Sequence, residues 1–337
     1  MNAQLEPLAR RPRLGFLGLG WIGCQRMQAL AESGVAEVAA IADASAEALD
    51  NARACAPGAE VARDLAGLLA VDDLDGVVIA TPSGAHAGQA IAALESGLAV
   101  FCQKPLTRTA EEAAQVLAAA RRADRLLDVD FSYRHVAGVG RLREAVRAGQ
   151  LGDLYAVDLV FHNAYGPDKD WFYDIARSGG GCVMDLGIHL VDLALWIAGP
   201  PARGSLDAQL YAGGRPLGAS ARAVEDYASV QWRLDSGASV RMACSWRLPA
   251  GRDAVIGAAF YGTRGGAALQ NVDGSFYDFN VELFQGTSRT TVASPPDAWG
   301  GRALVDWSRR LAEGGRYDPA ADHLLDVARL VDAVYGR

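Results

Sequence analysis

The chain has 337 residues, more than one hydrophobic core usually spans, so its length predicts two domains. Half of the residues are apolar and 21% are charged, which is the composition of an ordered globular protein and excludes a disordered one. The net charge is −8 and the chain has no basic run beyond Arg10-Arg11-Pro12-Arg13, so we expect no nucleic-acid partner.

Cysteine usage and hydropathy indicate in which cellular compartment the protein is expected. The five cysteines are scattered, odd in number and never form a C-x-x-C pair. This pattern argues against a disulfide framework and a structural zinc site, and we expect a cytoplasmic protein without a metal. No stretch of about 18 residues is apolar without charges, so no membrane span is expected. Residues 1–12 lack the hydrophobic stretch of a secretory signal and are interpreted as a flexible extension.

Residues 13–131 alternate strand and helix patterns with short links. Strands are expected over 14–18, 38–43, 75–82, 98–102 and 126–131, with helices from 21, 45, 86 and 109 between them. Thr109 and Glu112 form a capping box for the last of these helices. Because the strands are apolar throughout, they predict a parallel sheet covered on both faces, the doubly wound arrangement of a Rossmann domain.

Residues 132–337 follow a different pattern. Helices are expected over 137–148, 182–199, 302–313 and 319–335, and strands over 154–161, 254–261, 266–271, 276–284 and 287–293. Two further strands with alternating polarity flank Asp235-Ser236-Gly237 and predict a hairpin. We expect an α+β domain with an open, largely antiparallel sheet that binds substrate. One face of such a sheet needs a cover, so a homodimer or homotetramer through it is expected.

The dinucleotide motif G-x-G-x-x-G occurs directly after the first strand, at Gly18-Leu19-Gly20-Trp21-Ile22-Gly23. Gly18 permits the tight turn, Gly20 lets the backbone approach a pyrophosphate, and Gly23 lets the helix pack against the sheet. Asp43, at the end of the second strand, is placed to accept hydrogen bonds from an adenosine ribose. No Arg or Lys follows directly to hold a 2′-phosphate, which favours NAD, with NADP as the alternative.

Three ionisable residues lie on one stripe of the apolar helix predicted over 182–199. At about 100° per residue, Asp185, His189 and Asp192 fall within a narrow sector. A buried charge needs a partner, water or a ligand, so the stripe is expected to face one of these. Asp192 is interpreted as structural, paired with the backbone or with an Arg from the first domain.

Lys104 follows the expected strand 98–102 at its carboxyl end, where open α/β sheets bind ligands. Pro105 restricts its backbone and allows a cis peptide bond, which directs the amine. The long loop 162–180 is rich in aromatic and hydrogen-bonding groups that suit sugar recognition. Tyr133, Arg134 and His162 are weaker candidates to reach the same cleft.

Four segments together resemble the Gfo/Idh/MocA family, named after glucose-fructose oxidoreductase, inositol dehydrogenase and rhizopine catabolism proteins. They are the glycine motif, Ala80-Thr81-Pro82 with His86, QKPL at 103–106, and GGGCVMDLGIHLVDLALW at 179–196. The resemblance implies a Rossmann domain, a C-terminal domain with an open sheet, and oxidation or reduction of a sugar or cyclitol hydroxyl with a nicotinamide cofactor. The family's catalytic lysine falls on Lys104 and its D-x-x-x-H pair on Asp185 and His189.

The resemblance also implies which residues contact the cofactor. Besides the glycine motif with Trp21 and Ile22, and Asp43, these are Thr81, Pro82, His86, Gln103 and Lys104. His86 has the alternative role of capping the Thr-Pro turn. One departure matters, because the family's usual glutamate before the lysine is Gln103 here, which keeps hydrogen-bonding reach and removes a negative charge.

These patterns predict an NAD(P)-dependent oxidoreductase acting on a small polyhydroxylated substrate. His189 is expected to take the hydroxyl proton, while Asp185 binds substrate or biases the imidazole toward its protonated form. Two alternatives stay open. One is an NAD-dependent glycosidase that oxidises its substrate transiently, and the other is a non-catalytic dinucleotide sensor, which only Gln103 favours.

Overall fold

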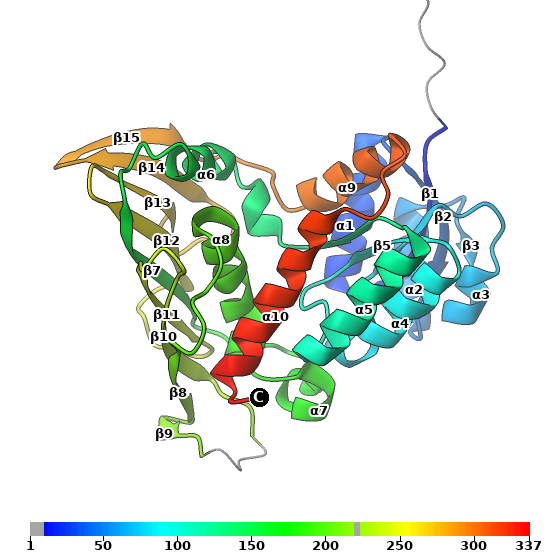
Figure 1. Ribbon diagram of the computed structural model, residues 1–337. Helices are drawn as coiled ribbons and strands as arrows, with labels where there is room; N and C mark the ends of the chain where they lie inside the picture. Colours follow the sequence, from blue (N-terminus) through cyan, green and yellow to red (C-terminus); the bar gives the residue numbers. More distant parts are fainter. Residues whose placement is uncertain (1–9, 219–222) are drawn as a thin grey trace, which may run out of the picture.

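The computed structural model describes residues 10–218 and 223–337 of the chain. Residues 1–9 of the predicted extension lie outside the described residues. Two β-sheets stand on opposite sides of the molecule, with helices α8 and α10 between them (Figure 1). The chain therefore has the predicted architecture of a parallel sheet followed by a second, mixed sheet.

The first sheet has six parallel strands in the order β3-β2-β1-β4-β5-β6. Its strands are β1 (Arg13–Leu17), β2 (Glu37–Ala42), β3 (Glu60–Val61), β4 (Gly76–Ile79), β5 (Ala99–Cys102) and β6 (Leu127–Val129). Its helices are α1 (Trp21–Ser33), α2 (Ala46–Cys55), α3 (Leu65–Leu69), α4 (Ser83–Glu95) and α5 (Ala110–Ala123). The order reverses between β1 and β4, which places a ligand site at the carboxyl ends of these strands.

The second sheet has nine strands in the order β15-β14-β13-β12-β7-β11-β10-β8-β9. Its strands are β7 (Leu154–Asn163), β8 (Asp207–Ala212), β9 (Arg215–Pro216), β10 (Tyr227–Arg233), β11 (Ser239–Ser245), β12 (Ala254–Gly262), β13 (Gly266–Asn271), β14 (Phe279–Gln285) and β15 (Ser288–Ala293). Neighbours pair antiparallel except β7 and β11, so the prediction of a largely antiparallel sheet is confirmed. The predicted hairpin is β10 and β11.

One face of the second sheet packs on helices. Helix α8 (Ile188–Ala198) packs on β7 and β12, and helix α6 (Val139–Arg147) packs on β13 and β14. Alternate residues of β7, β10 and β11 are buried on this sheet. Within the described ranges, no helix covers the other face (Figure 1). That face carries polar groups such as the Arg241–Asp158 ion pair among smaller apolar residues.

The apolar helix expected over 182–199 begins with a π-helical turn, Val183–Gly187, and continues as α8. The stretch Ile175–Ala198, which includes the short helix α7 (Ile175–Ser178), is long and apolar enough to cross a membrane by composition alone. However, 83% of its most apolar window is buried inside the protein, as in a core helix. The π turn also changes the directions of side chains on either side of it.

The last helices return to the first sheet. Helix α9 (Arg302–Ala312) packs on α1 and β5, where the buried Trp307 ring contacts Phe101 at 5.7 Å between centroids. Helix α10 (His323–Val334) packs on both α5 and α8. A single boundary at residue 131 therefore does not describe the packing, because a C-terminal helix completes the core of the N-terminal half.

Candidate active site

A cavity of about 830 Å³ follows the carboxyl edge of the first sheet and continues to the junction with the second domain. We call the part lined by Gly18, Gly20, Asp43, Ala44 and Arg63 the nucleotide end. The part lined by Gln103, Lys104, Trp171, Asp185 and His189 is the junction end. This volume is within the range of small-molecule and cofactor sites in proteins.

The glycine motif forms the wall of the nucleotide end. Gly18 has φ of +92°, and a Cβ there would lie 2.5 Å from the Ala80 backbone. A Cβ on Gly23 would lie 2.2 Å from the Gly18 oxygen, so each position requires glycine. A Cβ on Gly20 would meet no atom within 4 Å, and Gly20 precedes the first turn of α1. Open space beside unpaired helical N–H groups fits a pyrophosphate.

Asp43 lies beside this loop, as predicted. Its Oδ2 accepts a hydrogen bond from the Leu19 N–H at 2.6 Å, and its Oδ1 accepts one from the Ser45 N–H at 2.7 Å. Each carboxylate oxygen has further capacity to accept from a ribose hydroxyl. The structure also brings the exposed Arg63 to this end from the loop after β3, a cation that the sequence analysis missed. Its position could have been inferred because β3 ends at the same sheet edge as β2.

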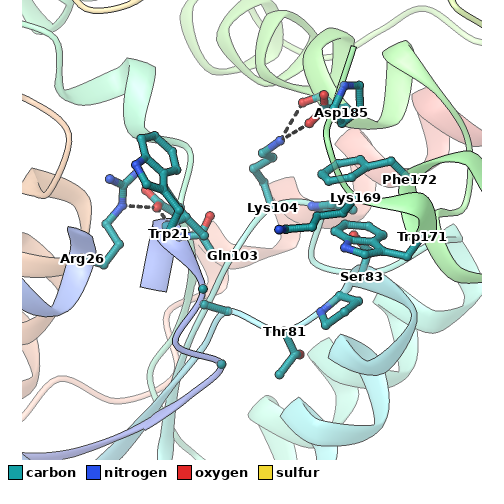
Figure 2. Close-up of a pocket in the computed structure, with 18 of the residues that line it drawn as sticks. Trp21, Arg26, Thr81, Ser83, Gln103, Lys104, Lys169, Trp171, Phe172 and Asp185 are labelled. Atoms are coloured by element: carbon teal, nitrogen blue, oxygen red, sulfur yellow. Dashed lines mark hydrogen bonds and ion pairs between the residues drawn. The ribbon is translucent and has the colours of Figure 1, made fainter. Parts of the chain in front are cut away.

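Lys104 bridges the two domains at the junction end (Figure 2). Its Nζ donates to the backbone oxygen of Asp185 at 2.8 Å and to Oδ1 of the same residue at 2.7 Å. Oδ2 of Asp185 accepts from the Trp246 indole N–H at 3.0 Å. The Lys104–Pro105 peptide bond is cis. Asp185 therefore holds the lysine amine in place with both its backbone and its side chain.

His189 is 8% exposed and lines the same cavity. Its ring packs edge-on against Tyr133, with 5.0 Å between centroids, and its Nδ1 is buried without a hydrogen-bond partner among the described residues. Burial lowers the pKa of His189 well below its ordinary value, and the charge of Lys104 lowers it further. Asp185 forms its ion pair with Lys104, and the shift of the His189 pKa is downward, opposite to the direction expected if Asp185 favoured the protonated imidazole.

Asp192 faces away from the cavity. It is 1% exposed, and its carboxylate accepts hydrogen bonds from the Arg134 guanidinium and from His323 Nε2. Burial alone would raise the pKa of Asp192, but Arg134 and His323 outweigh burial, and the pKa is lowered. The predicted structural role agrees with this geometry, but the partner Arg134 lies just beyond the predicted first domain, 13–131, and not within it.

His86 does not line the cavity, so the prediction that it contacts the cofactor is wrong. The ring is buried, and its two nitrogens lie 2.7 Å from the carbonyl oxygens of Pro105 and Thr81. Burial is the main cause that lowers the pKa of His86. His86 links the Thr81–Pro82 turn, which does line the cavity, to the turn that carries Lys104.

Gln103 lines the cavity next to Lys104 and donates its side-chain N–H to Asp130. Arg26 of α1 forms an ion pair with the same carboxylate. Neither Arg26 nor Asp130 was predicted from the sequence. Asp130 could have been found because it lies at the carboxyl end of the last predicted strand, at the same edge as Lys104.

The loop between β7 and α8 supplies an aromatic wall. Trp171 and Phe172 stack with 3.8 Å between ring centroids, and with Lys169 they lie beside Lys104 and Asp185 in the cavity (Figure 2). His162, at the start of this loop, bonds to Ser245 Oγ at 2.8 Å and does not line the cavity. Over residues 10–218 and 223–337, no group of three or more His, Cys, Asp or Glu side chains is arranged to hold a metal ion.

Comparison with known proteins agrees with this architecture. A family model described as an oxidoreductase family with an NAD-binding Rossmann fold matches residues 13–131. A second, described as the GFO/IDH/MocA C-terminal domain, matches residues 139–268. D-apiose dehydrogenase of Paraburkholderia graminis is 27% identical over 97% of this chain and 87% of its own length. The rhizopine catabolism protein MocA of Rhizobium meliloti is 34% identical over 56% of this chain and 58% of its own length.

Solved structures share the whole fold. Levoglucosan dehydrogenase in complex with NADH and levoglucosan superposes with a TM-score of 0.82 at 23% identity, covering 96% of both chains. A 3-ketoreductase from Actinomadura kijaniata in complex with NADP and TDP-benzene has a TM-score of 0.80 at 21% identity, covering 96% of this chain and 97% of its own. Because the two family models together match well over half of the chain, it belongs to the Gfo/Idh/MocA family of oxidoreductases, with a Rossmann domain that binds a nicotinamide dinucleotide.

Proposed function

We propose that this protein oxidises a hydroxyl-bearing carbon, or reduces the matching ketone, of a sugar, sugar derivative or cyclitol. The observation that carries the proposal is the ion pair of Lys104 with Asp185, which lies beside His189 in the cavity that also holds the glycine motif. An amine, a carboxylate and an imidazole at one end of a dinucleotide site are the groups that proton transfer to a reacting oxygen requires.

The residues of the nucleotide end fit a dinucleotide. The N–H groups at the start of α1 would hold the pyrophosphate beside Gly20, and Asp43 would accept from the ribose. The Thr81–Pro82 turn and Gln103 would line the nicotinamide. When bound, the nicotinamide supplies the hydride acceptor or donor, and the protein supplies position and proton transfer.

Lys104 and His189 have different roles at the reacting oxygen. The Lys104 ammonium, held by Asp185, donates a hydrogen bond to the substrate oxygen and stabilises the negative charge that develops there. His189 is neutral because burial lowers its pKa, so it accepts the hydroxyl proton during oxidation and returns it during reduction. Asp185 is the positioning residue for Lys104.

The aromatic wall suits a polyhydroxylated ring. Trp171 and Phe172 offer flat apolar faces to the C–H groups of a sugar, and Lys169 offers hydrogen bonds to its hydroxyls. The relatives named above act on D-apiose and levoglucosan by their names, which supports this substrate class.

A panel of polyols, cyclitols, sugars and glycosides tests the proposal, with NADH formation and glycoside cleavage followed separately. We expect net NADH formation with at least one panel member and a large loss of turnover in His189→Ala. Glycoside cleavage without net NADH would instead identify a transiently oxidising glycosidase. NADH binding without any turnover across the panel would favour a sensor and would overturn the proposal.

We also propose a second copy of the chain as the cover for the exposed face of the nine-stranded sheet, and a reducing compartment such as the cytoplasm. The support is the absence of a covering helix in the described residues and the five free thiols. Sedimentation analysis of the wild type and of the variant Ala243→Arg, on that face, tests the oligomer. A monomeric wild type would contradict it.

A further inference from the structure

The buried side chains of Gln103 and Asp130 lie next to each other where strands β5 and β6 end. Cys102 and Val129 are neighbours in parallel register, and the chain continues from them to Gln103 and Asp130. The Gln103 N–H donates to the Ile79 oxygen at 2.8 Å, and the Asp130 N–H donates to the Cys102 oxygen at 2.9 Å. Because both backbones are held in the sheet, the two side chains meet on its carboxyl edge, where both line the cavity.

Among the described residues, both hydrogen bonds to the Asp130 carboxylate are made to the same oxygen. Its Oδ2 accepts hydrogen bonds from Gln103 Nε2 and from Arg26 Nε, while its Oδ1 is buried without a partner among the described residues. The three side chains are nearly inaccessible, with Arg26 and Gln103 each 6% exposed and Asp130 1% exposed. Removing one partner of such a buried ion pair leaves an uncompensated charge.

This arrangement determines which way the Gln103 amide points. An ionised carboxylate only accepts hydrogen bonds, so the amide NH₂ of Gln103 must face Asp130. The carbonyl oxygen Oε1 is then turned away from Asp130. Gln103 lies between Arg26 and Lys104 on the cavity wall (Figure 2), so Oε1 is directed toward the space beside the lysine.

We propose that Arg26 and Asp130 are positioning residues that orient Gln103, so that this position presents a neutral hydrogen-bond acceptor to the nicotinamide half of the cofactor. The inference rests on the proposed function only for which half of the dinucleotide lies at the junction end. It explains why this chain has glutamine before Lys104. A glutamate there would face Asp130 with a second negative charge in a buried site. In this part of the site the negative charge is therefore carried by Asp130 and not by residue 103.

Gln103→Glu, Asp130→Asn and the double variant test this coupling through binding. The readouts are the Kd of NADH, the Kd of ADP-ribose, which lacks the nicotinamide ring, and the Tm of the cofactor-free protein. We expect Gln103→Glu to weaken NADH binding about tenfold or more and ADP-ribose binding by less than about twofold at about pH 8. In the double variant, NADH binding should return to within about threefold of wild type, because one carboxylate again meets one amide.

Gln89→Glu is the matched control, since Gln89 lines the same cavity and bonds to Thr81 rather than to Asp130. Asp130→Asn should not rescue it. If Asp130→Asn does not fold, the pH dependence of NADH binding by Gln103→Glu tests the proposal instead. Its NADH defect should shrink as the pH is lowered, because protonation removes the repulsion between two facing carboxylates, while the defect of Gln103→Leu should not.

Three results would overturn the proposal: unchanged NADH binding in Gln103→Glu, no rescue in the double variant, or equal loss of NADH and ADP-ribose binding. The proposed function has a separate outcome. A wild type that binds NADH but converts no substrate would remove the function and leave this binding test intact.

Discussion

The two ends of the cavity are built in different ways. At the nucleotide end the ligand-facing groups are backbone N–H donors, the half-exposed Asp43 and the exposed Arg63. At the junction end and directly behind it, charged side chains pair before any ligand arrives, in the ion pairs Arg26–Asp130, Lys104–Asp185 and Arg134–Asp192.

This difference teaches how each end should respond to substitution. At the nucleotide end a side chain contributes one contact among several backbone contacts, so its loss should change affinity by a small factor. At the junction end and directly behind it, each charged side chain of these ion pairs neutralises its partner, so its loss should damage either the chemistry or the fold. Four substitutions test this contrast.

Lys104→Met should have the largest effect. The variant keeps the length of the side chain and removes the ammonium that contacts the reacting oxygen, so turnover should fall by about 10²- to 10⁴-fold. NADH should still bind within a few-fold of wild type. Steady-state kinetics and a fluorescence titration measure the two quantities. Lys169→Met, at another lysine that lines the cavity, should raise KM more than it lowers kcat. Comparable turnover in the two variants would remove Lys104 from its role.

Arg134→Met should damage the fold rather than the chemistry. It leaves the Asp192 carboxylate buried with His323 alone, and breaking a buried pair costs about 3–5 kcal/mol. Urea unfolding measures the loss. Arg143→Met is the control, because both guanidinium groups lie over Trp196 but Arg143 bonds to a carbonyl oxygen. Equal losses of stability would show that packing on Trp196, and not the ion pair, matters.

His189→Gln should change how stability depends on pH. The folded protein holds His189 neutral with its pKa lowered, whereas in the unfolded chain the imidazole titrates near 6.5. The unfolded chain therefore binds more protons below about pH 6.5, and stability falls as pH decreases toward the folded pKa. His86 has the same direction of shift, so the variant should lose part of the slope of Tm against pH between about 8 and 5. An unchanged slope would mean that the imidazole is solvated.

Arg63→Ala should have the smallest effect and should act on one cofactor only. Arg63 lines the nucleotide end near Asp43, where an arginine accommodates a 2′-phosphate. We expect kcat/KM for NADP to fall about five- to tenfold while that for NAD changes by less than about twofold. Arg53→Ala, an exposed change on α2, is the control. Equal losses for the two cofactors would assign Arg63 to the adenine ring instead.

Local patterns predicted most of the fold and the nucleotide end. Uniformly apolar strands, glycines at tight turns and the acid after β2 each have a physical cause within a few residues of chain. The hairpin β10–β11 follows from alternating polarity around one turn.

The junction end could be predicted only in part, because its contacts join distant segments. The assumption of about 100° per residue placed Asp185, His189 and Asp192 on one stripe, but the π turn and the partners Lys104 and Arg134 separate their environments. Both nitrogens of His86 face carbonyls, which no spacing in the sequence indicates.

Helix α9 has a consequence for dividing this protein. Its Trp307, with Ala303 and Leu304, fills the core beside Leu14, Phe16 and Phe101 of the first sheet. A fragment that stops at residue 131 would lack α9 and would expose Leu14, Phe16 and Phe101. The loss of burial would cost roughly 1.5–3 kcal/mol for each of these large side chains. Chimaeras that exchange cofactor domains between relatives should therefore transplant residues 302–312 together with 13–131, since neither piece is self-sufficient.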